Sequence, residues 1–133
     1  IQAGGNDVIR LRSDDDVRAD IDRATALARE RSERVVLMPA GNVGNAPFFF
    51  PPASWLMTDR ARRLHGFVRE AATRHGAVVV NLFKEKADDP FAQTPELNAV
   101  DGLHPSDAGY RVWRDELLAQ SGWAEVLAGA RAR

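Results

Sequence analysis

Apolar residues recur along this sequence at the spacing of amphipathic helices, and short runs that are apolar throughout separate these stretches. The first helical stripe lies between residues 14 and 31, where apolar side chains return every three or four positions. This stripe consists of Val17, Ile21, Ala24 and Ala28. Ser13, with Asp16 three residues later, is typical of a helix N-terminus. The pattern therefore predicts a helix over residues 14–31.

The same period predicts two further helices. Residues 58–75 carry a stripe of apolar side chains, with Thr58 as the predicted N-cap and Gly76 as the stop. The stripe consists of Ala61, Leu64, Val68, Ala71 and Ala72. Ser106 is predicted to cap a third helix that reaches about Gln120 and ends at Gly122, which leaves residues 122–133 as a C-terminal tail.

Two continuous apolar runs, over 35–39 and 77–82, are too brief for helices and rich in β-branched residues, which favours buried strands. Residues 1–3 have the character of the end of another buried strand, and long loops are predicted over 40–57 and 83–104. Strands that alternate with helices predict a single α/β domain over residues 1–133, with a parallel sheet covered by helices on both faces.

Composition narrows the classes of partner. The chain is 44% hydrophobic and 28% charged with a net charge of -1, which gives no electrostatic reason to expect nucleic acid or anionic lipid. It has no cysteine, which excludes disulfides and thiolate metal sites, and no apolar run long enough to span a bilayer. His65 and His75 are predicted to lie solvated on different faces of the second helix, so no metal site is expected.

Asp101 and His104 stand three residues apart in the loop before the third helix. Around a turn, this spacing lets the carboxylate reach one ring nitrogen and leaves the other free to accept a proton. Pro105 and the cap at Ser106 stiffen the exit from the loop. The motif predicts a general base with its orienting carboxylate, although alone it is more often a surface loop with a local hydrogen bond.

Gly4-Gly5-Asn6-Asp7 places a side-chain amide beside two glycines. An amide N–H can stabilise the oxyanion that forms on a carbonyl under attack, and glycines let the backbone approach a ligand closely. Alone, these residues are typical of a turn. In a parallel sheet, however, Asn6 and the Asp101–His104 pair both follow strands, at the edge where ligands bind. The predicted fold therefore joins the two clusters in one acyl-transfer site.

The two clusters resemble conserved blocks of the SGNH (GDSL-type) serine hydrolases. Gly4-Gly5-Asn6-Asp7 is similar to their third block, and Asp101-Gly102-Leu103-His104-Pro105, followed by Gly109-Tyr110, is similar to their fifth. The resemblance extends over essentially the whole chain and implies a flavodoxin-like three-layer α/β/α fold. It also implies Asn6 as oxyanion donor, Asp101 as orienting residue and His104 as general base, in an acyl-group chemistry that uses no metal and no cofactor.

One part of the family pattern is missing. The Gly-Asp-Ser block, which carries the nucleophile, and a later glycine that donates to the oxyanion do not occur here. The serines of this chain all stand in other contexts: Ser13, Ser32, Ser54, Ser106 and Ser121. We therefore expect the nucleophile and the N-terminal strands to belong to an N-terminal remainder of the same protein, absent from this chain.

The predicted function is serine-dependent hydrolysis of a small-molecule carboxylic ester, lipid or acylated sugar. Alternatives are an acyltransferase with an alcohol in place of water, and a catalytically inactive binding module of the same fold. A metallophosphoesterase turn at residues 4–7 would need further histidine and carboxylate clusters, which the sequence lacks. Phe48, Phe49 and Phe50 follow the middle strand and are predicted to line an acyl pocket, with core packing as the alternative.

Overall fold

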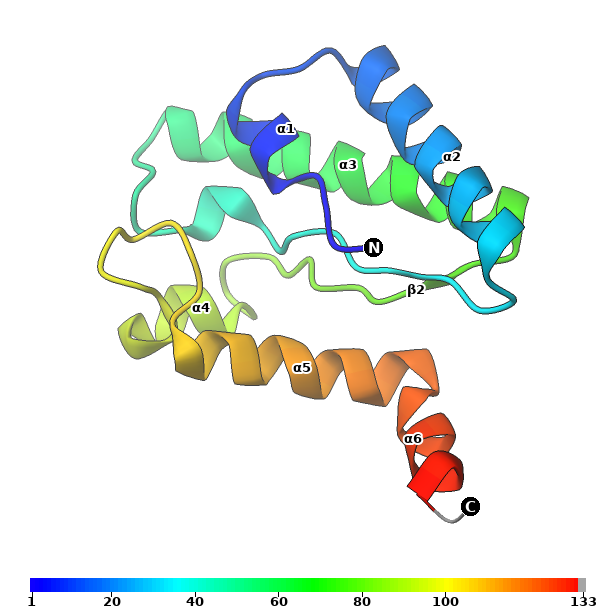
Figure 1. The fold of residues 1–133 in the computed structure, drawn as a ribbon. Coiled ribbons are helices and arrows are strands. Elements are labelled where there is room, and N and C mark those ends of the chain that lie inside the picture. Colours follow the sequence, from blue (N-terminus) through cyan, green and yellow to red (C-terminus); the bar gives the residue numbers. More distant parts are fainter. Residues whose placement is uncertain (132–133) are drawn as a thin grey trace.

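The computed structural model describes residues 1–131, in which a parallel sheet lies between two layers of helices (Figure 1). The elements are α1 (Gly5–Ile9), α2 (Asp14–Arg31), β1 (Val36–Leu37), η1 (Val43–Asn45), α3 (Ala53–His75), β2 (Val78–Val79), α4 (Pro90–Gln93), η2 (Pro95–Leu97), α5 (Asp107–Ser121) and α6 (Trp123–Arg131). Helices α1, α2 and α3 cover one face of the sheet and α5 covers the other. The predicted α/β fold with a parallel sheet is confirmed. Within the described residues, no helix has the length and apolar character needed to cross a bilayer.

The sheet is shorter than the apolar runs that predict it. β1 and β2 pair in parallel, with Val36 opposite Val78, and each spans two residues. Backbone pairing continues for one residue beyond each strand, because the Val78 N–H donates to the Val35 carbonyl and the Val80 N–H donates to the Leu37 carbonyl, both at 2.9 Å. Val35, Val80 and Leu82 are buried as well.

Residue Ile1 extends the sheet on the other side of β1. Its amino group donates to the Val36 carbonyl at 2.6 Å, and the Met38 N–H donates to the Ile1 carbonyl at 2.8 Å. The predicted N-terminal strand is therefore present as an extended segment with strand-like pairing, although these contacts are too few to make a full strand. The resulting order is the N-terminal segment, β1 and then β2.

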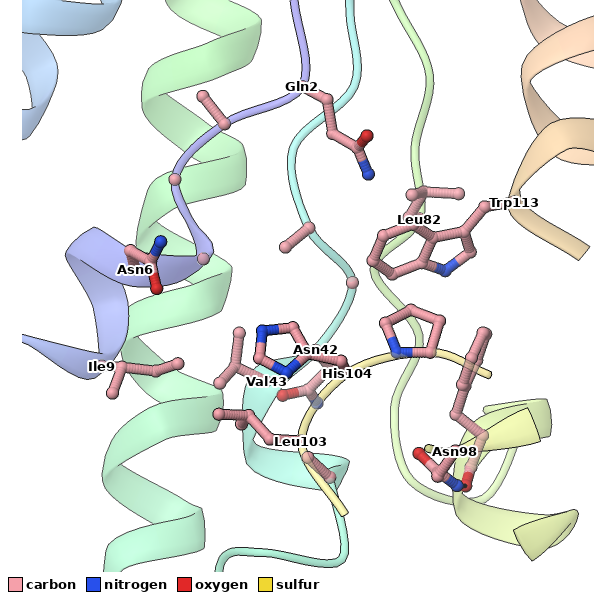
Figure 2. Close-up of a pocket in the computed structure, with 18 of the residues that line it drawn as sticks. Gln2, Asn6, Ile9, Asn42, Val43, Leu82, Asn98, Leu103, His104 and Trp113 are labelled. Carbon is pink, nitrogen blue, oxygen red and sulfur yellow. Dashed lines mark hydrogen bonds between the residues drawn. The ribbon is translucent and has the colours of Figure 1, made fainter. Parts of the chain in front are cut away.

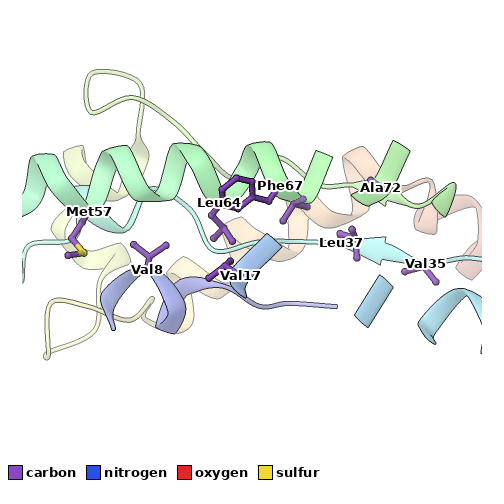
Figure 3. Packing of buried hydrophobic residues seen from close by; sticks show 9 residues of the cluster. Val8, Val17, Val35, Leu37, Met57, Leu64, Phe67 and Ala72 are labelled. Atoms are coloured by element: carbon purple, nitrogen blue, oxygen red, sulfur yellow. The ribbon is translucent and has the colours of Figure 1, made fainter. Parts of the chain in front are cut away.

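The hydrophobic core lies between α3, α2 and the sheet. All five residues of the predicted α3 stripe are at most 4% exposed, which confirms the helical period. Val8 of α1, Val17 of α2 and Leu37 of β1 complete a cluster around Leu64 (Figure 3). Full burial of a branched apolar side chain stabilises a fold by about 1.5–3 kcal/mol. This cluster therefore fixes α1, and with it Asn6, against α3.

The start of α3 is a correction. Thr58 was predicted as the N-cap, but the helix begins at Ala53 and Pro52 occupies the N-cap position. A proline suits the first turn because that turn has no intrahelical partner for its N–H. Met57 is 6% exposed and packs in the core, so burial favours the earlier start. The predicted C-terminal stop is confirmed, since Gly76 has a left-handed φ of 66°.

The histidines of α3 are a second correction. His65 is 2% exposed rather than solvated, and its Nε2 lies 2.8 Å from the Ala40 carbonyl oxygen. His75 does not stand free in solvent either, because its Nε2 lies 2.9 Å from Asp22 of α2. Both rings have found polar partners on neighbouring elements, which helical spacing alone does not indicate.

The two predicted loops contain short helices. η1 lies in the first, while α4 and η2 lie in the second. Asp89 begins α4 as its N-cap, with its carboxylate accepting the Phe91 N–H at 3.0 Å. The third predicted helix is confirmed as α5, capped by Ser106 and ended by Gly122 with φ 69°. The predicted tail forms α6, and its last two residues lie outside the described part of the chain.

Candidate active site

The Asp101–His104 pair lies in a small hairpin that closes on itself. The Ala99 N–H donates to the His104 carbonyl at 2.8 Å, and the Ser106 N–H donates to the Leu97 carbonyl at 2.8 Å. Gly102, at the turn, has a left-handed φ of 67° that an L side chain rarely adopts. The hairpin directly precedes α5, so the first turn of that helix anchors it.

Within this hairpin, Asp101 binds His104 as the spacing predicts. His104 Nδ1 lies 2.7 Å from Asp101 Oδ2. Asp101 Oδ1 also accepts the backbone N–H groups of Leu103 at 2.9 Å and His104 at 3.0 Å. The carboxylate is therefore held by the backbone on one oxygen and holds the imidazole with the other.

These hydrogen bonds favour the ionised carboxylate. The His104 backbone N–H, the His104 ring and the Leu103 N–H, in that order, lower the pKa of Asp101 to about 2. The group stays negative at neutral pH and can keep an N–H on the facing ring nitrogen. Nε2 of His104 has no hydrogen-bond partner among residues 1–131, so it is the nitrogen available to accept a proton.

A cavity of about 500 Å³ opens at this end of the sheet, and both clusters line it (Figure 2). Its walls come from residues 2–9, from the segment after β1, from Leu82 after β2, from the hairpin and from α5. This volume is in the range of small-molecule sites. The predicted meeting of the N-terminal cluster with the hairpin, nearly a hundred positions apart in sequence, is therefore present in the structure.

Asn6 faces this cavity from the first turn of α1, so the predicted turn at residues 4–7 is the start of a short helix. The left-handed φ of 100° at Gly4 makes the bend, and a Cβ there would lie 2.6 Å from a methyl group of Leu64. Only glycine fits both conditions. Asp7 pairs with Arg12 at 3.2 Å and ties the turn. The Asn6 side-chain amide makes no hydrogen bond to any described residue.

The three phenylalanines are a correction at this site, because none of Phe48, Phe49 and Phe50 lines the cavity. Phe48 and Phe50 are largely exposed, and Phe49 packs against the hydrophobic core. The Phe48 backbone lies beside the hairpin, since its N–H donates to the Gly102 carbonyl at 2.9 Å. The core-packing alternative holds for Phe49.

Aromatic residues elsewhere line the cavity instead, namely Phe91 of α4 together with Tyr110 and Trp113 of α5. Of these three, the sequence singles out Tyr110 alone, as part of the Gly109-Tyr110 pair that resembles the fifth family block. The three-residue spacing between Tyr110 and Trp113 was the available signal, since it places them on one face of α5, the helix that follows the hairpin. Phe91 gave no such signal, because α4 was not predicted.

None of the five serines lines the cavity. Ser106, the nearest in sequence to His104, donates to the Glu96 carbonyl at 2.6 Å and accepts the Gly109 N–H. It is a helix cap, as predicted. Among the described residues, no three histidine, aspartate or glutamate side chains gather as metal ligands would.

Comparison with known proteins bears on the family and the fold of this chain. The model of the GDSL-like lipase/acylhydrolase family matches residues 1–112. The crystal structure of LAE5, an alpha/beta hydrolase enzyme from the metagenome of Lake Arreo, Spain, superposes with a TM-score of 0.69 at 22% sequence identity. The alignment covers 91% of this chain and 57% of that one, so this chain spans a little over half the length of LAE5. No curated protein sequence matches it.

Proposed function

Because this chain belongs to the GDSL-like lipase/acylhydrolase family, we propose that it carries the acid–base pair and the oxyanion donor of a serine-dependent carboxylic ester hydrolase. The observation that supports this most directly is the 2.7 Å contact between Asp101 Oδ2 and His104 Nδ1, in a cavity that Asn6 also lines. The other ring nitrogen is free, and the amide faces the same space.

In the proposed reaction, a serine hydroxyl attacks the ester carbonyl and gives its proton to His104 Nε2. The negative charge moves to the carbonyl oxygen, where the Asn6 N–H donates to it. The ester C–O bond then breaks, and His104 returns the proton to the leaving alcohol. Water, deprotonated by His104, releases the acid from the acyl-serine. A positioned base contributes roughly 10²–10⁴-fold to such a reaction.

The nucleophile is proposed to come from a segment outside these 133 residues. Gln2 supports this proposal, because its backbone N–H and carbonyl make no hydrogen bond to the described residues while Ile1 pairs with β1. An unpaired strand edge of this kind takes up a neighbouring strand readily. That strand would lie next to Asn6 and at the mouth of the cavity.

His104→Ala tests the proposal in the protein that includes the nucleophile. Turnover of p-nitrophenyl acetate should fall roughly 10²–10⁴-fold, because the proton acceptor is lost. His75→Ala is the matched control, since it removes a histidine that does not line the cavity, and its turnover should stay near the parent value. A His104→Ala protein with near-normal kcat would remove His104 from this role.

A further inference from the structure

The cavity has an aromatic wall on the α5 side, formed by Phe91, Tyr110 and Trp113. The Trp113 ring lies 5.9 Å from Phe91 and 5.8 Å from Tyr110, measured between ring centroids, and the second contact is edge-to-face. Contacts of this kind hold rings in fixed orientations. Trp113 therefore presents a braced surface rather than a loose side chain.

This wall is separate from the hydrophobic core. None of its three rings belongs to the buried cluster around Leu64, and Tyr110 is 50% exposed. Figure 2 shows Trp113 beside Leu82, with the His104 ring between these residues and Asn6. A ligand that covers apolar area bordering an open cavity removes this area from water, and this burial favours binding. The aromatic wall can therefore contact one part of a substrate while another part of the same substrate reacts at His104.

The charges of the cavity restrict the ligand further. No arginine or lysine lines it within the described part of the chain, and its two carboxylates are already occupied. Asp7 pairs with Arg12, while Asp89 accepts from Asn45 Nδ2 at 2.7 Å and from the Phe91 N–H at 3.0 Å. A phosphate or carboxylate of a substrate would find no counter-ion here and would lose hydration without compensation.

We propose that the cavity selects uncharged esters that carry a compact ring, and that Trp113 with Leu82 binds this ring. The inference rests on the proposed ester hydrolysis and adds the class of substrate to it. The ring can belong to the alcohol or to the acyl half of the ester, since both share the same chemistry toward an indole face. Anionic esters of the same shape are disfavoured, because residues 1–131 place no arginine or lysine in the wall of the cavity.

The first experiment compares kcat/KM in two substrate series, using the protein that includes the nucleophile. Benzyl acetate against methyl acetate places the ring on the alcohol, and methyl benzoate against methyl acetate places it on the acyl group. Trp113→Ala should lower the ring-to-methyl ratio on the order of tenfold in one series, because the covering face is lost. The series that responds identifies the half of the ester.

Two controls make this result specific. Trp55→Ala removes a tryptophan that is 69% exposed and outside the cavity, and it should leave both ratios at the parent value. Trp113→Phe keeps a ring and should recover much of the ratio if Trp113→Ala folds poorly. Ratios that Trp113→Ala leaves unchanged in both series would overturn the assignment of Trp113.

A second experiment tests whether the cavity selects against negatively charged esters. The acetate ester of 4-(hydroxymethyl)benzoate has the shape of benzyl acetate with a carboxylate added. Its kcat/KM should be at least about tenfold below that of benzyl acetate, since a desolvated charge without a partner is costly. Equal or faster turnover of the anionic ester would overturn the selection for uncharged substrates.

A binding measurement separates this inference from the proposed function. Trp113 fluorescence, recorded in a Trp55→Phe, Trp123→Phe background, should change on titration with benzyl alcohol or toluene. If the protein hydrolyses no ester, methyl acetate included, the proposed function fails while a saturable fluorescence change still supports the ring site. If esters are hydrolysed but neither ligand changes the fluorescence, the ring site fails alone.

Discussion

At the scale of single residues, three hydrogen bonds to Asp101 determine the ionisation and the orientation of its carboxylate. Two come from backbone N–H groups, which do not titrate, and the third comes from the His104 ring. The backbone therefore holds the carboxylate in the orientation that the imidazole needs. An amide at this position would keep the two backbone bonds and lose the charge.

Asp101→Asn should lower turnover by about a hundredfold or more in the protein that includes the nucleophile, because the ring would lose its anionic partner and its fixed tautomer.

The carboxyl carbon of Asp101, followed by NMR, should titrate with a midpoint of about 2. Since this pKa lies below the ordinary value, the bonds stabilise the fold above pH 4 and lose that effect as the pH falls toward 2. A midpoint near 4 would contradict the hydrogen-bonded geometry.

His65 is the other titratable residue whose surroundings matter. Burial lowers its pKa, with Arg69 acting in the same direction, while the bond to the Ala40 carbonyl opposes this. The unfolded chain therefore takes up a proton that the folded chain resists. The stability linked to His65 is present above pH 6.5 and is lost as the pH falls below it.

His65→Gln keeps a donor that can reach the Ala40 carbonyl but does not titrate. The urea midpoint of the parent protein should fall between pH 7.5 and pH 5, and the fall should be smaller in the variant. Urea unfolding followed by circular dichroism at the two pH values measures both. An identical fall in the two proteins would show that other groups are responsible.

At this scale, spacing along the sequence predicts contacts between neighbouring residues well, but it predicts poorly where a side chain lies in the folded protein. The Asp101–His104 bond was predictable because three residues of backbone fix it. The absence of Phe48–Phe50 from the cavity and the burial of His65 go with contacts to residues distant in sequence, such as Gly102 for Phe48 and Ala40 for His65. Neither is encoded within a few residues of the side chain concerned.

At the scale of the elements, α5 connects the hairpin to the aromatic wall. Gly109 lets this helix pack closely against the residues beside it. A Cβ on Gly109 would lie 2.3 Å from the Leu97 carbonyl oxygen and 2.7 Å from the Phe91 ring. The helix thus approaches η2 and α4 more closely than any other residue would permit. This close approach brings Phe91 to Trp113.

Gly109→Ala should reduce the free energy of unfolding by about 1–3 kcal/mol, because backbone rather than a flexible side chain stands in the way. Gly66→Ala is the matched control. Gly66 lies within α3 with no atom within 4 Å of its missing Cβ, so alanine should stabilise the helix by up to about 1 kcal/mol. Thermal unfolding measures both, and equal effects would contradict the packing argument.

The elements α2 and α5, which have a long regular pattern, were predicted almost to the residue, as was the end of α3 but not its start. Short elements held by single contacts were not. α4 depends on the cap at Asp89 and on the bond from Asn45 to that carboxylate, across 44 positions. No periodicity marks such an element, because tertiary contacts rather than an apolar face define it.

At the scale of the whole molecule, the sheet edge connects distant parts of the sequence. Alternating strands and helices were sufficient to predict this, because parallel strands place their carboxyl ends together. The volume and lining of the cavity were not predictable, since they depend on how loops 40–52 and 83–97 fold back. The nucleophile is the remaining part of the proposed site.

A fluorophosphonate probe tests this arrangement. The 133-residue chain alone should neither react with the probe nor hydrolyse p-nitrophenyl acetate, because no serine lines the cavity. The protein that includes the proposed segment should be labelled at a serine in that segment, as peptide mass spectrometry would identify. Labelling of Ser106 or another serine of this chain would contradict the proposal.

The closed hairpin over residues 97–106 contains both residues of the acid–base pair in one local segment of the chain. Its own hydrogen bonds, from Ala99 to His104 and from Ser106 to Leu97, close the hairpin, and both members of the pair lie within it, so their contact needs no side chain of the sheet. Walls such as Leu82 and Trp113 are contributed by other elements and can be exchanged one at a time. Substitutions in these walls can therefore change which substrate the cavity binds while the Asp101–His104 pair stays the same.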